Sequence, residues 1–337
     1  MILNQGLINL KDTVLRRFFS ELTLIGIGLL LLISCTEESE AWRDPRNMNG
    51  DQAPGEFLHG EFIDNFTYKV YPKNDENFDL ATFKLWLPDT SEDLMGILVL
   101  LPIHNGSAMS LYEDKNWREF ATAHHLALVS VMLYTSRETV GYINAANGSG
   151  RALNEAISKL GEENGLADFE SLKYVFRGYE VGASFCISFS ENYPKKVAAI
   201  GSIRGTSGGN EINNNLNIPT LMVIGDLDFR MPNNRSAVLS KREVGGLWAL
   251  AIEPGKDRLG SQLPSDNLIR SFLTFAIENR IDPDTKLLKS IPEEYGWLGD
   301  NNTFDIKPFG DYQDNVTEAS WLIHGDFASD WRQFQLK

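Results

Sequence analysis

Cysteine is almost absent from this chain, which has only Cys35 and Cys186 among its 337 residues. Cys35 closes an apolar N-terminal run that reads as an export leader, so the mature chain would keep one cysteine within its folded part. A single folded cysteine forms no intramolecular disulfide, and the fold must therefore be stabilised by its hydrophobic core. We expect Cys186 to lie in that core as a small apolar residue.

Positive charge is also scarce. The chain has 31 Lys and Arg against 46 Asp and Glu, a net charge of −15. A chain this acidic repels polyphosphates, and no run of Lys and Arg interleaved with aromatic residues could follow a nucleic-acid backbone, so nucleic acid is an unfavourable partner. The sequence has no phosphate-binding glycine loop and no His, Cys or carboxylate cluster with the spacing of metal ligands. We therefore expect no cofactor and no metal.

A long hydrophobic run occurs only near the N-terminus, where basic residues precede an apolar stretch from Leu22 to Ser34. The stretch is shorter than the roughly 20 residues that a membrane-spanning helix needs. It ends at Leu32-Ile33-Ser34-Cys35, which resembles the lipobox of bacterial lipoproteins, in which the cysteine receives the lipid. This predicts a leader over 1–35 and lipidation at Cys35, with a short uncleaved anchor as the alternative. Both interpretations place the folded part of the chain outside the cytoplasm. Contact with the membrane would then be through the anchor alone.

Acidic residues follow the cysteine directly. Thr36-Glu37-Glu38-Ser39-Glu40 resembles the surface-export signal of lipoproteins in the Bacteroidetes group, which implies the outer-membrane surface as one location. From there to Gly60 the chain is rich in Asn, Asp, Pro and Gly and has no apolar periodicity. We predict a tether over 36–60.

The apolar pattern from 61 to 280 is that of an α/β domain. Residues 66–71 and 82–87 alternate apolar and polar, as the two strands of a half-exposed antiparallel hairpin do. Residues 97–101 and 126–131 are continuously apolar, which indicates strands buried on both faces.

The alternation of strand and helix continues to Asn279, which indicates βαβ units with right-handed crossovers. We predict a single doubly wound, mostly parallel sheet with an antiparallel N-terminal hairpin. Residues 281–337 look irregular, and we expect them to form a tail packed on the domain.

The main motif is Gly178-Tyr179-Glu180-Val181-Gly182, between a predicted strand at 172–176 and a helix that starts at Ala183. The G-x-S-x-G nucleophile elbow has this context, and its glycines remove side chains that would clash in the sharp turn. Both glycines are present, but Glu180 stands where the serine would be. Over about Gly96 to Asn279 the chain resembles secreted α/β-hydrolases of the esterase and depolymerase kind.

This resemblance implies the α/β-hydrolase fold and a place for each catalytic group. An oxyanion loop would follow the third strand, at His104-Asn105-Gly106, and the acid would follow the seventh, at Asp228. The histidine would follow the eighth strand, but residues 253–260 contain none. The triad is therefore degenerate. The pocket would be lined by these groups and by Tyr134, Tyr179, Val181, Lys256 and Asp257.

Two hypotheses follow for function. In the first, the chain is a non-catalytic esterase homologue that binds a small molecule or a glycan in this pocket, because a serine hydroxyl needs an adjacent base and neither Glu180 nor Lys256 reproduces that pair. In the second, it is an active carboxylic-ester hydrolase with Glu180 as nucleophile or general base, His104 as proton carrier and Asp228 as orienting acid. A structural role also stays open, since Glu180 could simply cap the helix that follows it. Ser184 could be the nucleophile only if the motif were shifted along the sequence, and the shifted motif lacks its second glycine.

Overall fold

The computed structural model describes residues 60–89, 93–137, 141–206 and 214–336, all within the compact unit Leu58–Lys337. The predicted leader, Cys35 and the predicted tether before Gly60 lie outside the described residues. The strands are β1 (Gly60–Asp64), β2 (Thr67–Val70), β3 (Leu80–Trp86), β4 (Gly96–Leu101), β5 (Leu126–Tyr134), β6 (Lys173–Tyr179), β7 (Val197–Ile203), β8 (Thr220–Gly225), β9 (Trp248–Glu253), β10 (Trp297–Asp300), β11 (Ile306–Pro308) and β12 (Ala319–Leu322). The helices are α3 (Met109–Tyr112), α4 (Lys115–Ala123), α5 (Ser149–Glu163), α6 (Val181–Asn192), α7 (Met231–Glu243), α8 (Leu263–Arg280) and α9 (Gly325–Gln335). None of these helices combines the length and apolarity that crossing a membrane requires.

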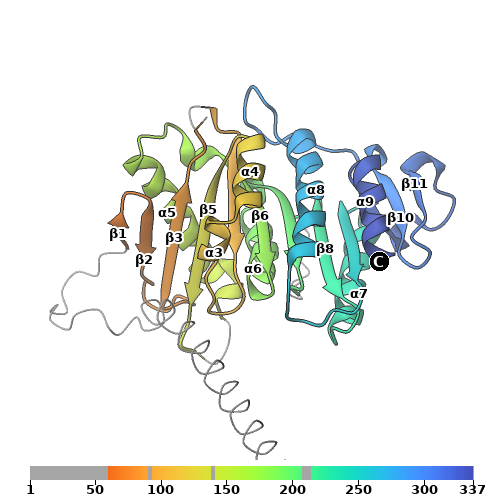
Figure 1. Ribbon diagram of the computed structural model, residues 1–337, viewed down its shortest axis with the longest axis horizontal. Helices are drawn as coiled ribbons and strands as arrows, with labels where there is room; N and C mark the ends of the chain where they lie inside the picture. Colours follow the sequence, from red (N-terminus) through yellow and green to blue (C-terminus); the bar gives the residue numbers. More distant parts are fainter. Residues whose placement is uncertain (1–59, 90–92, 138–140, 207–213, 337) are drawn as a thin grey trace, which may run out of the picture. The chain divides into compact units, whose positions relative to one another are not determined.

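Nine strands form the main sheet in the order β1-β2-β3-β5-β4-β6-β7-β8-β9 (Figure 1). β1, β2 and β3 pair antiparallel, β3 also pairs antiparallel with β5, and the strands from β5 through β9 are parallel to one another. The predicted mostly parallel sheet with an antiparallel N-terminal hairpin is confirmed, and this is the α/β-hydrolase fold. Because β1 precedes the hairpin, the third, seventh and eighth strands of the prediction are β4, β8 and β9.

The sheet is covered by helices on both faces, and β4 shows why. Its residues Leu98 and Leu100 pack with α4 and α8 on one face, while Ile97, Val99 and Leu101 pack with α5 and α6 on the other. Successive side chains of a strand point to opposite faces, so a strand covered on both faces must be apolar throughout. Cys186 lies fully buried in α6, as predicted.

The C-terminal residues differ from the irregular tail that the sequence suggested. They form a second, antiparallel sheet in the order β11-β10-β12, followed by α9. We call 281–336 the C-terminal module. Its tryptophans Trp321 and Trp331 are fully buried in the same hydrophobic cluster as α4 and α8. Short strands with few alternating residues give little periodicity, which is why the pattern escaped prediction.

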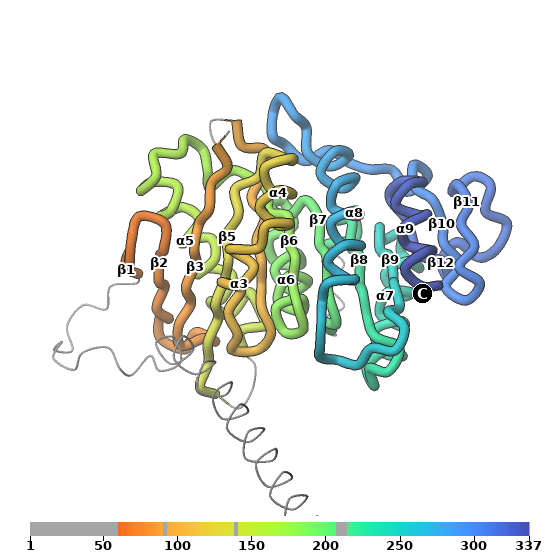
Figure 2. The backbone as a smooth tube through the Cα atoms, in the orientation of Figure 1, coloured from red at the N-terminus to blue at the C-terminus, as the bar shows by residue number. Residues whose placement is uncertain are grey.

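The C-terminal module covers the last strand of the main sheet. β12 and α9 lie beside β9 (Figure 2), and their side chains bind its outward backbone groups. Ser320 Oγ accepts a hydrogen bond from Leu250 N at 2.9 Å, Trp331 Nε1 donates to Leu250 O at 2.6 Å, and Gln335 Oε1 accepts from Ile252 N at 3.0 Å. An uncovered edge strand would be open to pairing with another chain. The C-terminal module thus closes this edge.

Candidate functional site

The turn from β6 into α6 has the geometry of a nucleophile elbow. Glu180 adopts φ 54° and ψ −113°, a strained conformation for a residue with a side chain. A Cβ on Gly178 would lie 2.5 Å from Ala183 Cα, and one on Gly182 would lie 2.3 Å from Pro102 O. Both positions therefore require glycine. The turn has kept the tight geometry that, in an esterase, projects a serine above the sheet.

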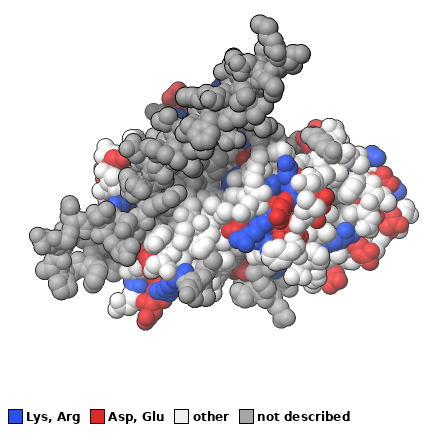
Figure 3. Space-filling view, turned by 60° about the horizontal axis from the view of Figure 1, so that its bottom comes forward, with Lys and Arg blue, Asp and Glu red and all other residues white. Residues whose placement is uncertain are grey.

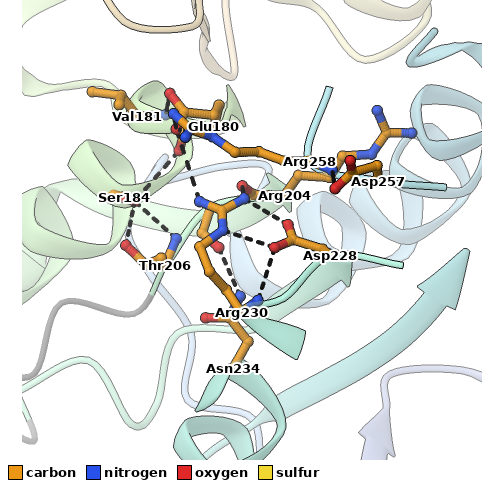
Figure 4. Close-up of polar contacts among 11 residues, drawn as sticks. Glu180, Val181, Ser184, Arg204, Thr206, Asp228, Arg230, Asn234, Asp257 and Arg258 are labelled. Atoms are coloured by element: carbon orange, nitrogen blue, oxygen red, sulfur yellow. Dashed lines mark hydrogen bonds and ion pairs between the residues drawn. The ribbon is translucent and has the colours of Figure 1, made fainter. Parts of the chain in front are cut away.

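The carboxylate of Glu180 is 3% exposed, and both of its oxygens are bound (Figure 4). Oε2 accepts a hydrogen bond from the backbone N–H of Val181 at 2.7 Å. Oε1 accepts two from Arg258, from Nε at 3.0 Å and from Nη2 at 2.6 Å. In α/β-hydrolases the N–H after the nucleophile helps to bind the developing oxyanion. In this chain the elbow residue's own side chain occupies that N–H.

Arg258 stands on the loop after β9, where the resemblance implies the histidine. Lys256 and Asp257 are the residues predicted from this loop, but the structure brings Arg258, which was not predicted, to the elbow. Asp257 is exposed and accepts from the backbone N–H of Arg258, and the backbone N–H of Lys256 donates to Asp226. An arginine stays protonated in proteins, so this loop supplies a permanent cation rather than a base.

Asp228, at the acid position after β8, is paired with a second arginine. Arg230 Nη2 lies 2.6 Å from Asp228 Oδ2, and Arg230 Nε donates to Oδ1 at 2.9 Å. Burial alone would raise the pKa of Asp228, but the hydrogen bonds and the charge of Arg230 outweigh it and hold this pKa below its ordinary value. Arg230 Nη1 also lies 3.8 Å from Glu180 Oε1. Arg230 therefore links the nucleophile and acid positions.

The network continues to the ends of β7 and β9. Arg230 Nη2 donates to the backbone oxygen of Arg204 at 2.8 Å, and Arg204 Nη2 donates to Glu253 Oε2 at 2.7 Å. Glu180, Arg204 and Asp228 follow β6, β7 and β8, and Glu253 is the last residue of β9, so the charges join the carboxyl ends of four neighbouring strands. Figure 3 turns this edge towards the viewer and shows basic and acidic side chains side by side on its uncovered part. We call Glu180, Arg258, Arg230 and Asp228 the elbow network.

The predicted oxyanion loop after β4 is fixed by its neighbours. Asn105 N donates to the hydroxyl of Tyr142 at 2.9 Å, and the Asn105 side chain exchanges two hydrogen bonds with the backbone of Thr135. Burial raises the pKa of Tyr142; the hydrogen bond from Asn105 N opposes this shift, and the charge of Glu180 adds to it. His104 Nε2 is buried and has no hydrogen-bond partner among the described residues. Within those residues, no hydrogen bond joins His104 to Glu180.

The other predicted pocket residues differ in how deeply they are buried. Tyr134 ends β5 and is half-buried, while Tyr179 and Val181 flank Glu180 and are buried. Gly106 donates its N–H to Ile103 O and closes the loop after β4. Ser184 lies one turn into α6, where its Oγ contacts Thr206 Oγ1 at 3.0 Å and donates to the backbone oxygen of Glu180 at 3.4 Å (Figure 4). In the part of the chain that the structure describes, no three His, Cys, Asp or Glu side chains converge as a metal site would require.

No family model and no curated protein matches this chain. Solved structures of several hydrolases do resemble it. The poly(3-hydroxybutyrate) depolymerase LpqC from Bordetella parapertussis is 13% identical over 61% of this chain and 88% of its own, with a TM-score of 0.42. Esterase PE8 is 18% identical over 56% and 96%, with a TM-score of 0.44. The S-formylglutathione hydrolase FrmB from Staphylococcus aureus is 14% identical over 65% and 99%, also with 0.44. The fold assignment rests on the strand order and the elbow described above.

A further buried ion pair, outside the elbow network, lies between α6 and α7. Glu191 is 4% exposed, and its Oε1 lies 3.8 Å from Lys241 Nζ, which also donates to Asn215 Oδ1 at 3.3 Å. Burial raises the pKa of Glu191 from its ordinary 4.5 to about 7, although the charge of Lys241 opposes this shift. Between pH 4.5 and about 7, Glu191 is therefore protonated in the folded state but has already released its proton in the unfolded state.

This pair predicts a dependence of stability on pH. Because the pKa of Glu191 is higher in the folded state, its contribution to the free energy of unfolding should fall as the pH rises from 4.5 to about 7. Glu191→Gln should flatten this part of the profile, measured by urea unfolding at several pH values. Glu243→Gln, at an exposed glutamate of α7, is the control and should leave the profile unchanged. A profile that Glu191→Gln does not alter would show that Glu191 titrates normally.

Proposed function

We propose that this chain is a non-catalytic homologue of the esterase-type α/β-hydrolases, exported and lipid-anchored at Cys35, that binds a ligand at the carboxyl edge of its sheet. The observation that carries this proposal is the engagement of Glu180, whose carboxylate oxygens are held by Val181 N and by Arg258. The residue at the apex of the elbow acts here as the partner of an arginine.

Ester hydrolysis by this fold needs a free nucleophile, a base beside it and a vacant oxyanion N–H. The elbow of this chain has a carboxylate instead of a hydroxyl, the loop after β9 offers Arg258 instead of a base, and Val181 N already donates to Glu180. These three departures agree with one another. The occupied N–H of Val181 follows from the glutamate itself, but the arginine in place of a base after β9 is a separate departure that one substitution at the elbow of an active enzyme would not produce.

The alternative is an active hydrolase that uses Glu180, His104 and Asp228. A carboxylate nucleophile would need one oxygen directed at the substrate, and the ester it forms would need a base to activate water. Glu180 directs Oε1 at Arg258, and Asp228 directs both oxygens at Arg230 rather than at a histidine. The contacts therefore favour the non-catalytic proposal.

The ligand class that we propose is a small molecule or a glycan. The carboxyl edge of an α/β sheet is where ligands of such folds bind. On this edge Tyr134 is half-buried, and the Arg258 side chain is 43% exposed. These groups could still contact a ligand from solvent.

The proposal predicts that the purified protein does not hydrolyse short-chain nitrophenyl esters and does not react with a fluorophosphonate probe. The double variant Glu180→Ser, Arg258→His should gain reactivity with the probe, because serine frees Val181 N and a ring nitrogen replaces the guanidinium that contacts residue 180. A general base contributes about 10²-fold or more, so the double variant should react at least about tenfold faster than Glu180→Ser alone.

The single variant Arg258→His, which keeps the glutamate, is the matched control and should stay inert. Ester hydrolysis by the unaltered protein that disappears in Glu180→Gln would overturn the proposal and favour the active hydrolase. Circular dichroism of each variant would establish that a lack of reactivity does not come from unfolding.

A further inference from the structure

Four large apolar side chains are exposed at the carboxyl edge of the main sheet. Leu227 is 65% exposed and Phe229 78%, on the loop after β8, while Leu259 is 55% and Leu263 59%, on the loop after β9 and at the start of α8. We call these four residues the apolar rim. Scattered exposed apolar residues are normal, but several on adjoining loops indicate an interaction surface.

The two loops that carry the apolar rim are held together. Leu227 N donates to Lys256 O at 2.9 Å, and Arg204 donates to the backbone oxygens of Gly260 and Ser261. Asp228, between the two exposed residues of the first loop, is 2% exposed and fixed by Arg230. The elbow network thus holds both loops in place. The exposed side chains stand on a rigid support, which reduces the ordering that binding would require.

The charges around the apolar rim cancel locally. Asp226, Asp228 and Asp257 stand beside Arg230, Lys256 and Arg258 on the same two loops, whereas the whole chain carries −15. A surface that is apolar at its tips and neutral around them fits an uncharged apolar partner better than a strongly charged one.

We propose that the apolar rim docks on the surface of a lipid bilayer, with Leu227, Phe229, Leu259 and Leu263 entering the boundary between headgroups and acyl chains. This inference rests on the proposed lipid anchor at Cys35, which would keep the body beside a membrane. The predicted tether, 36–60, could span up to about 80 Å if fully extended, so the anchor alone leaves the orientation of the body open. A second contact of this kind adds to a lipid anchor and fixes which face is turned to the membrane.

Flotation with phosphatidylcholine vesicles tests the proposal, using residues 58–337, a compact unit that contains all the described hydrophobic clusters. Without its anchor, this unit should still bind the vesicles. The triple variant Leu227→Ser, Phe229→Ser, Leu259→Ser should lower the bound fraction by about tenfold or more, because each apolar side chain removed weakens partitioning into the interface. Binding should change little between low and high salt, since insertion is not driven by charge.

The matched control is Val244→Ser, Leu287→Ser, Tyr295→Ser, which removes three side chains of similar exposure, 51%, 59% and 77%, from other parts of the surface. It should bind like the unaltered unit. Equal binding by the two triple variants, or no binding by the unaltered unit, would overturn the proposal. Self-association without vesicle binding, abolished in the first triple variant, would also overturn it and assign the rim to a contact between copies. Labelling of the full chain with a radioactive fatty acid, lost in Cys35→Ala, tests the anchor separately.

Discussion

Replacing Glu180 by alanine is expected to lower the free energy of unfolding by about 2–3 kcal/mol, measured by urea unfolding. Removing one partner of a buried ion pair commonly costs about 3–5 kcal/mol, and the solvent exposure of Arg258 reduces this cost. Glu180 also accepts from Val181 N as the N-cap of α6, which contributes about 1 kcal/mol more. The substitution leaves Arg258 without its carboxylate and Arg230 with Asp228 alone.

Two further variants separate the causes of this loss. Glu180→Gly should cost less than Glu180→Ala by about 1 kcal/mol, because glycine adopts positive φ without strain. A double-mutant cycle with Glu180→Gln and Arg258→Met should give a coupling energy of about 1–3 kcal/mol. A coupling energy near zero would mean that the contact contributes nothing to stability, and the structural interpretation of the elbow network would fail.

The largest loss of stability is expected at the C-terminal module. Trp331→Ala should lower the free energy of unfolding by about 3–5 kcal/mol, because it opens a cavity at a fully buried aromatic side chain. It also removes the indole N–H that binds Leu250 O at 2.6 Å, which leaves that carbonyl of β9 only the longer hydrogen bond from Ser320 Oγ at 3.3 Å. Thermal unfolding should shift down by roughly 10 °C in a chain of this size.

Trp331→Phe is the matched control. It keeps most of the aromatic volume and loses only the hydrogen bond, so it should cost about 1–2 kcal/mol. If Trp331→Ala and Trp331→Phe cost the same, packing against β9 would contribute little and the hydrogen bond would carry the interaction. A Trp331→Ala variant as stable as the unaltered protein would contradict the buried position of this residue.

The sheet could be predicted from the sequence because its signal is local. β4 and β5 are continuously apolar because both of their faces are covered. β2 and β3 were found from their alternating apolar and polar residues, although most of their residues are buried, more than the alternation predicts. The elbow was visible for a similar reason, since Gly178 and Gly182 are demanded by contacts within a few residues or with the adjoining strand. Where the environment of a residue is set by its near neighbours in the chain, the pattern of residue types is sufficient to predict the local structure.

The partners of Glu180 were not visible, because Arg258 and Arg230 reach it from loops far along the chain. The loop after β9 contains no histidine, and Lys256 and Asp257 were its predicted pocket residues. One signal was present: a buried carboxylate at the elbow needs a cation, and Arg258 stands in the loop where esterase-type α/β-hydrolases have their base. The need to neutralise a buried carboxylate indicates Arg258 as its partner, whereas a pattern of catalytic residue types does not.

The bond between Glu180 Oε2 and Val181 N also bears on how activity could be lost or regained. The carboxylate of the preceding residue competes for that N–H at a very high effective concentration, which can exceed about 10⁵ M for well-oriented groups. A diffusing ester carbonyl, present at millimolar levels or less, could not displace it. If the chain is non-catalytic, as proposed, new nucleophiles or bases elsewhere on this edge would therefore remain without effect while the glutamate is present, and hydrolysis could arise only after residue 180 changes.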